Sequence, residues 1–185
     1  PAMGEPSGVC HHFLSKILVN NIKFSEFWNW IEAPVMFAII GGNPAQFQPL
    51  FQYYKELYQH YGHDPKNFNV GVHMHSFFGE NSKQTADYYY PVYSAQMNRV
   101  GASRGWGAFS RSQYDQGRGK DGAYLFGDAN EAIDKILHLH EMFGLTRFSA
   151  HMDVGGPSHA MLMKSIEIFG TRVAPKVREA LAKKV

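Results

Sequence analysis

The sequence predicts an α/β fold built around a parallel sheet. From residue 33 onward, short apolar runs alternate with long amphipathic runs of helical spacing, which is the order that βα units produce. Two of the apolar runs end in a Gly-Gly pair with a proline close behind, at residues 41–44 and 155–157. The chain has 185 residues, 44% of them apolar and 18% charged, which suffices for one packed core. We therefore expect one domain over residues 33–185 and leave residues 1–32 unassigned.

The first βα unit begins with the run at residues 33–40. This run is apolar without a break, which predicts a strand buried on both faces. Asn43 and Pro44 suit the N-cap and the first position of a helix whose apolar side chains recur at helical spacing up to Gly62. Pro49 lies inside that span and removes a backbone donor, so we expect a kink or a restarted helix there.

The second unit has a strand at residues 69–78, where His73 and His75 share one face because side chains alternate along a strand. A helix capped by Ser82 is expected next, with a bend at Pro91. Residues 101–121 are rich in glycine, cations and large rings, which predicts a long irregular connection of the kind that forms lids and binding loops.

The rest of the chain is the most regular. After a short apolar run at residues 123–126, a helix is predicted at about residues 129–143, ending at Gly144. A strand at residues 146–154 follows. The last helix opens after the Gly-Gly-Pro-Ser corner, is interrupted near Pro175 and ends in cations that suit its negative pole.

Composition argues against several classes of function. The net charge is only +2 and the aromatic residues fall at core spacing, which disfavours nucleic acid as a partner. The longest apolar stretch has about eight residues, against roughly 20 for a membrane-spanning helix, and no basic leader precedes an apolar segment. A single cysteine, Cys10, fits a reducing compartment. We expect a cytoplasmic protein without membrane contact.

Two groups of residues are candidates for a binding site. Each Gly-Gly corner stands before a helix, where backbone N–H groups favour an anion such as phosphate, although glycines also simply permit tight turns. For His73 and His75, three interpretations stay open. In order of preference, they form hydrogen bonds inside the core, line a pocket, or bind a metal together with His151 and Asp153.

Four stretches of the chain carry a family pattern. They are Met-Phe-Ala-Ile-Ile-Gly-Gly-Asn-Pro-Ala-Gln-Phe at 36–47, Val-Gly-Val-His-Met-His at 70–75, Gly-Asp-Ala-Asn-Glu-Ala-Ile-Asp-Lys-Ile at 127–136, and the ending at 147–175. Read in order, they resemble the C-terminal half of the luciferase-like flavin monooxygenases, the family that includes bacterial luciferase. The resemblance spans roughly residues 33–182.

The resemblance implies a parallel (β/α)8 TIM barrel, of which this chain would hold only the C-terminal portion, because such barrels take about 250 residues. It implies a flavin-dependent monooxygenase or oxidoreductase that uses reduced flavin mononucleotide (FMN), or a related deazaflavin, and oxygen on a small organic substrate. A flavin reductase would supply the reduced cofactor. The residues expected to contact the cofactor, at or near the strand ends, are Ile40, Gly41, Gly42, His75, Phe77, Gly155 and Gly156.

No catalytic residue is assigned, because the strands that carry such residues in the family are not recognisable in residues 1–32. Residues 101–121 are expected to form a lid that keeps water from the flavin. An incomplete barrel exposes sheet edges and an apolar face, so the chain could instead be a non-catalytic flavin-binding or assembly subunit. In either case we expect a homodimer. A metal-dependent hydrolase is the third alternative.

Overall fold

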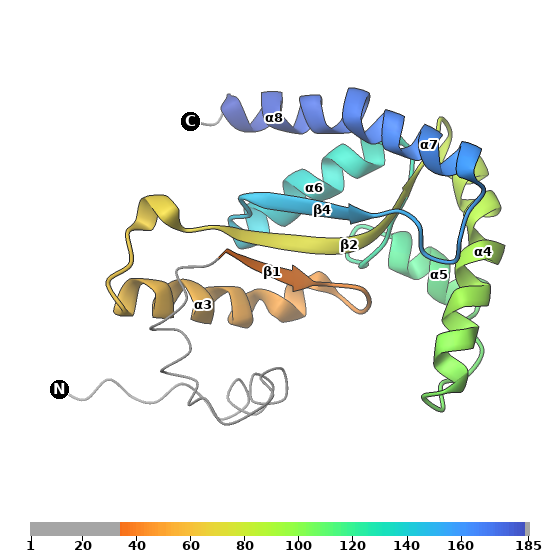
Figure 1. Cartoon of the computed structure of the whole chain (residues 1–185), viewed down its shortest axis with the longest axis horizontal. Helices are drawn as coiled ribbons and strands as arrows, with labels where there is room; N and C mark the ends of the chain where they lie inside the picture. Colours follow the sequence, from red (N-terminus) through yellow and green to blue (C-terminus); the bar gives the residue numbers. More distant parts are fainter. Residues whose placement is uncertain (1–33, 184–185) are drawn as a thin grey trace.

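The computed structural model describes residues 34–183, so the unassigned segment at residues 1–32, with Cys10, lies outside the described part (Figure 1). The elements follow in the order β1 (Val35–Ala38), η1 (Pro44–Phe47), α3 (Gln48–His60), η2 (Pro65–Asn67), β2 (Val70–Phe78), α4 (Ser82–Ala102), α5 (Arg111–Arg118), β3 (Leu125–Gly127), α6 (Ala129–Phe143), β4 (Arg147–His151), α7 (His159–Ile168), η3 (Phe169–Val173) and α8 (Ala174–Ala182).

The sheet is parallel throughout, as the sequence predicts. Strand β2 lies at its centre, with β1 and β4 on either side of its first half and β3 beside its last residues. Figure 1 shows the arrows of β1, β2 and β4 pointing the same way. The C-terminal ends of the strands therefore meet at one edge of the sheet, and both Gly-Gly corners follow strands that end there.

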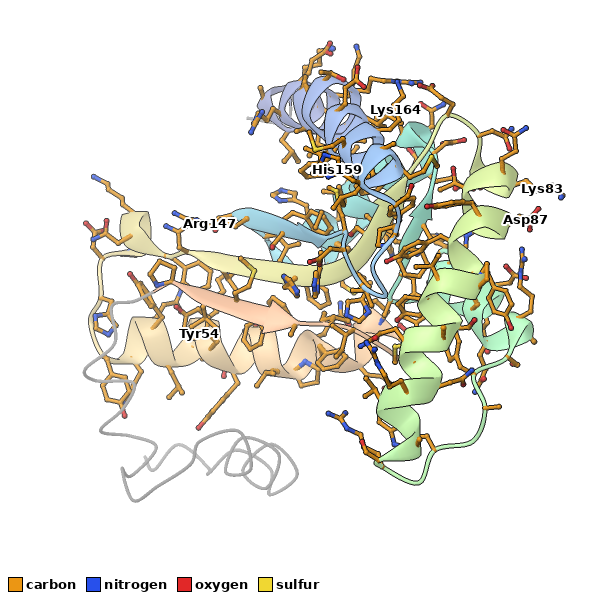
Figure 2. All side chains as sticks on the ribbon, turned by 45° about the vertical axis from the view of Figure 1, so that its right-hand side comes forward. Tyr54, Lys83, Asp87, Arg147, His159 and Lys164 are labelled. Carbon is orange, nitrogen blue, oxygen red and sulfur yellow. The ribbon has the colours of Figure 1, made fainter. Side chains whose placement is uncertain are left out.

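The hydrophobic core lies on the face of the sheet that the helices cover. We call this the outer face, and the opposite face, which carries His73 and His75, the inner face. Val72 and Met74 of β2 are fully buried on the outer face. The ring centroids of Phe37 and Phe51 of α3 lie 4.3 Å apart. Phe51 stacks on Phe143 of α6 with a centroid distance of 4.1 Å. Figure 1 shows α3 on one side of the strands and the long α7–α8 rod on the other, and Figure 2 labels Tyr54 on α3, another buried ring. Phe37 contacts α3, and Phe148 contacts Phe169 of η3. Both are strand partners of Val72 and lie on its face, so these helices cover one face of the sheet.

The prediction that the first strand is buried on both faces is wrong. Burial alternates along β1, and Met36 is 43% exposed whereas Val35 and Phe37 pack against the core. Met36 and Ala38 point to the inner face, where their partners across the strand pair are Gly71 and His73. The continuous apolar run reflects a strand with two apolar faces, of which the described residues cover only the outer one.

The segment after β1 begins with a short 3₁₀ turn rather than an α-helix. The Asn43 side chain accepts a hydrogen bond from the Ala45 N–H at 2.9 Å, and Pro44 stands at the first position, as expected. The α-helix α3 starts only at Gln48, with Pro49 in its first turn. The predicted restart at Pro49 is therefore confirmed, because proline is tolerated where no N–H partner is required.

Two details of the second unit differ from the prediction. Asn81, not Ser82, caps α4, because its side chain accepts from the Gln84 N–H at 3.0 Å. Residues 101–121 are not wholly irregular, since they contain α5. A capping box between Ser110 and Gln113 starts this helix. The many glycines of this segment argued against a helix, whereas the Ser-x-x-Gln spacing of the capping box indicates where α5 begins.

The last part of the chain follows the prediction closely. Helix α6 spans Ala129–Phe143 and ends at Gly144, whose φ of +66° is the left-handed cap expected of glycine. Strand β4 is shorter than predicted. The expected interruption of the final helix is the π-helical segment η3, which precedes Pro175 and accommodates its missing N–H. Within residues 34–183, no helix combines the length and the apolar character needed to cross a bilayer.

Candidate functional site at the C-terminal edge of the sheet

The corner after β1 is open. A Cβ atom added to Gly41 would meet nothing within 4 Å, and Gly42 has a φ of +76° that favours glycine. The corner leads into the 3₁₀ turn, where Pro44 lacks an N–H and the Asn43 side chain already accepts the Ala45 N–H. The backbone here offers fewer free donors to an anion than the α-helix start that the sequence predicts.

The corner after β4 is closed by α4. A Cβ atom on Gly155 would come within 2.5 Å of the Val92 carbonyl oxygen. The Tyr89 hydroxyl donates to the Val154 carbonyl at 2.8 Å, and the Tyr88 hydroxyl lies 3.2 Å from the Ser158 backbone nitrogen, which donates to it. Gly155 is therefore required for close approach of the helix, and Gly156, with a φ of +72°, for the turn.

An apolar pocket of about 530 Å³ opens beside the end of β1. Its walls come from β1, the corner after it, η1, α4, the segment before α5, α5 itself and the residue before β3. None of the lining side chains is charged. The lining residues are Ala38, Ile40, Gly41, Phe47, Met97, Trp106, Gly107, Ala108, Phe109, Gln113 and Tyr124. A second pocket of about 560 Å³ shares Phe109, Gln113 and Tyr124 and adds Gly42 and Lys120. Three predicted residues, Ile40, Gly41 and Gly42, thus line adjoining pockets.

The other predicted residues lie elsewhere. Phe77 of β2 is fully buried against α4. Its ring stacks on that of Tyr89 with a centroid distance of 4.3 Å. His75 is 8% exposed, and its Nδ1 lies 2.8 Å from the Tyr93 hydroxyl oxygen. Burial, with the neighbouring His151 and His73, lowers the pKa of His75 to about 4. The ring centroids of Tyr93 and Phe109 lie 5.6 Å apart, and Phe109 lines the apolar pocket. The Tyr93 ring therefore stands between His75 and this pocket wall.

A further group of polar side chains lies on the inner face. His73 Nε2 is 3.3 Å from His151 Nδ1, and His151 Nε2 is 2.8 Å from a carboxylate oxygen of Asp153. Ser149 Oγ lies 3.0 Å from His73 Nδ1. Sequence reasoning placed His73 and His75 on one face, but it did not predict that β4 pairs with β2 so that Ser149 lies beside His73. In the described residues, no group of three or more His, Cys, Asp or Glu side chains could hold a metal ion.

Comparison with solved structures identifies the fold. The structure matches the monooxygenase RslO1 from Streptomyces bottropensis with a TM-score of 0.63 at 18% identity, over 82% of this chain and 44% of that chain. It matches the long-chain alkane monooxygenase LadA with a TM-score of 0.53 at 11% identity, over 84% of this chain and 39% of that one. The fold is that of the luciferase-like monooxygenases.

A third solved structure has the same luciferase-like fold. It is the coenzyme F420-dependent tetrahydromethanopterin reductase from Methanopyrus kandleri, with a TM-score of 0.51 at 16% identity, over 79% of this chain and 46% of that chain. At these identities the likeness establishes the fold alone. The chain spans less than half the length of each of these proteins. No model of a known protein family matches the sequence, and no curated protein does so either.

The luciferase-like fold is a (β/α)8 barrel, and the described residues match part of one. Active sites of such barrels lie at the C-terminal ends of the strands. The corner at Gly41, the apolar pocket and the histidines of β2 all lie toward that edge of the sheet. Trp106 and Phe109, which line the pocket, belong to residues 101–121, the segment that we expect from the sequence to form a lid.

Proposed function

We propose that this chain forms part of a flavin-dependent oxidoreductase that binds its cofactor in the apolar pocket beside β1. The observation that carries the proposal is the position of that pocket: an uncharged, ring-lined cavity at the C-terminal edge of a parallel sheet with the luciferase-like fold. The names of the matched proteins support the class, since two are monooxygenases and one depends on coenzyme F420, a deazaflavin.

The lining fits a planar, mostly apolar heterocycle. Trp106 and Phe109 offer ring faces for stacking, and Gly41 lets a ligand approach the backbone closely. In the adjoining pocket, Lys120 is the cation that we propose holds a phosphate group, beside the carboxylate of Asp121, which lines the same pocket. When bound, a reduced flavin supplies electrons to oxygen, and the role of the chain is to orient the ring and to exclude water. The substrate would be a small organic molecule.

The proposal is tested by titrating the chain with FMN, reduced FMN under anaerobic conditions, and F420, and following the fluorescence or absorbance of the cofactor. We expect saturable binding that Trp106→Ala weakens about tenfold, because one stacking face is lost. Ile166→Ala, on the exposed side of α7, is the matched control and should bind as the wild type does. No saturable binding of any of the three cofactors would overturn the proposal.

Monooxygenase activity is a separate expectation. If the chain is catalytically active, it should change the rate at which oxygen oxidises reduced FMN. Binding without such a change would favour a non-catalytic flavin-binding or assembly subunit. Exposed apolar side chains favour that second candidate, since Met36, Trp106 and Met163 are 43%, 52% and 50% exposed. In both cases we propose association as a homodimer, and for the enzyme a flavin reductase as the source of reduced cofactor.

A further inference from the structure

A chain of hydrogen-bonded side chains crosses the inner face of the sheet from β4 to β2 and back. It runs from Ser149 Oγ to His73 Nδ1 at 3.0 Å, from His73 Nε2 to His151 Nδ1 at 3.3 Å, and from His151 Nε2 to Asp153 Oδ1 at 2.8 Å. The register of β2 and β4 holds the members in place, because His73 lies opposite Ser149 and His75 opposite His151. The Asp153 side chain is 68% exposed, whereas His73 and Ser149 are half-buried.

The carboxylate determines the direction of every bond in this chain. A carboxylate only accepts hydrogen bonds, so the Nε2 atom of His151 carries a hydrogen. In neutral His151 the Nδ1 atom is then an acceptor, and it must receive its bond from the Nε2–H of His73. The Nδ1 atom of neutral His73 receives in turn from the Ser149 hydroxyl. All three bonds therefore point toward Asp153, and both rings have the Nε2–H tautomer.

We propose that Ser149, His73, His151 and Asp153 form a proton relay that connects a hydroxylated substrate on the inner face with solvent at Asp153. Ser149 Oγ takes the proton of the substrate hydroxyl and gives its own to His73 Nδ1. His73 passes its Nε2 proton to His151 Nδ1, and His151 passes its Nε2 proton to Asp153, which releases it to water. One proton enters and one leaves. Each ring then loses its Nδ1 proton to water and takes up a proton at Nε2, because both His73 and His151 are partly exposed.

The relay lies within reach of the apolar pocket. Ala38, which lines that pocket, is the partner of His73 across β1 and β2, and Ser149 is the partner of His73 on the other side. The row from Ala38 to Ser149 therefore spans about 10 Å at roughly 4.8 Å per strand. A substrate that extends from the pocket over His73 reaches Ser149. The relay rests on the proposed function only for the identity of that substrate.

The surroundings of His73 and His75 favour the neutral forms of these two rings. Burial lowers the pKa of His73, and the neighbouring His151 lowers it further. His75 faces the same pair from β2, with a pKa lowered to about 4, and Tyr93 of α4 contacts His75. Tyr89 of α4 lies near Asp153, and Arg147 precedes Ser149 on the same face of β4.

The tautomers are measured by ¹⁵N NMR of the ligand-free chain labelled at histidine, with His73→Gln and His151→Gln to assign the signals. At neutral pH we expect both rings to show a protonated Nε2 and an unprotonated Nδ1. An Nδ1–H tautomer in either ring would overturn the relay.

Removal of Asp153 separates a relay from a set of local contacts. Asp153→Ala should change the tautomer of His73, which it does not touch, as well as that of His151. Asp134→Ala, an exposed carboxylate on α6, is the control and should leave both rings unchanged. If Asp153→Ala alters His151 alone, the relay is refuted. These NMR measurements need no cofactor. Failure of FMN binding would therefore overturn the proposed function without bearing on the relay.

Discussion

Lys135 shows how one residue can hold a connection in place. Its side chain is 9% exposed, and its ammonium nitrogen donates to the carbonyl oxygens of Arg118, Gly122 and Tyr124 at 3.0, 3.2 and 2.7 Å. The segment it holds, residues 118–124, includes Lys120 and Tyr124, which line the candidate pockets. A residue of α6 thus positions part of the candidate site through the backbone of another element.

Lys135→Met should lower the free energy of unfolding by about 2–4 kcal/mol, because buried carbonyl groups lose their donor. Lys83→Met is the matched control. The Lys83 side chain is 85% exposed and pairs only with surface Asp87, so its loss should cost less than about 1 kcal/mol (Figure 2). Urea denaturation of the two variants measures the difference, and equal costs would contradict the role given to Lys135.

His75 should make stability depend on pH. Burial, with His151 and His73, holds its pKa at about 4 in the folded chain, against 6.5 for an ordinary histidine. Between these values the unfolded chain binds more protons than the folded one. The contribution to stability is therefore complete above pH 6.5 and is lost as the pH falls toward 4. The loss should amount to about 2–3 kcal/mol.

The prediction is tested with His75→Gln, which keeps a polar partner for Tyr93 but does not titrate. Urea denaturation at pH 7 and pH 4 should show a larger loss of stability in the wild type than in the variant. The other titrating groups act in both proteins and cancel in the comparison. Parallel pH dependences would show that His75 is not held neutral by its surroundings.

Among the elements, the corner between β4 and α7 makes the sharpest prediction. Gly155→Ala would place a methyl group 2.5 Å from the Val92 carbonyl oxygen, at a φ of +84°. We expect a loss of about 3 kcal/mol or more, because α4 must shift. At Gly156→Ala, with a φ of +72° and nothing within 4 Å, the cost should stay near 1 kcal/mol. Thermal or urea unfolding compares the pair, and similar losses would mean that α4 does not press on this corner.

At the scale of the whole molecule, the inner face is the open side of the fold. Met36 is 43% exposed there, and in the described residues β1 and β4 each pair with β2 alone. We predict that the chain self-associates at micromolar concentration and that Met36→Glu weakens this association about tenfold or more. Gln59→Glu, on the exposed side of α3, is the control. Sedimentation velocity measures the association, and a wild-type monomer would contradict it.

Much of the fold was predictable because its signals are local. The helix at Ala129–Phe143 carries an N-terminal cap at Asp128 and a C-terminal glycine at Gly144, both within a few residues of its ends. The alternation in β2 placed His73 and His75 on one face. The prediction failed at α5, where glycines and cations masked a short helix, and at β1, where an apolar run could not reveal which face is covered.

The candidate site was predicted in part. Ile40, Gly41 and Gly42 line adjoining pockets, whereas Phe77 packs in the core and Gly155 supports a helix. Which side chain on a strand meets a neighbouring element depends on curvature and packing, and periodicity does not report them. The sequence placed Trp106 and Phe109 in a long irregular connection, and only the tertiary structure shows that they line a pocket together with the end of β1.

By itself the sequence determined the order of the long helices, some of their caps and the parallel arrangement of the strands, because periodicity and capping act over a few residues. The tertiary structure alone decided which residues meet. Ser149 lies 76 positions from His73 along the chain, and His151 lies 78 positions from it. Their contact depends on the register of β2 against β4, which the packing of whole helices on the sheet selects.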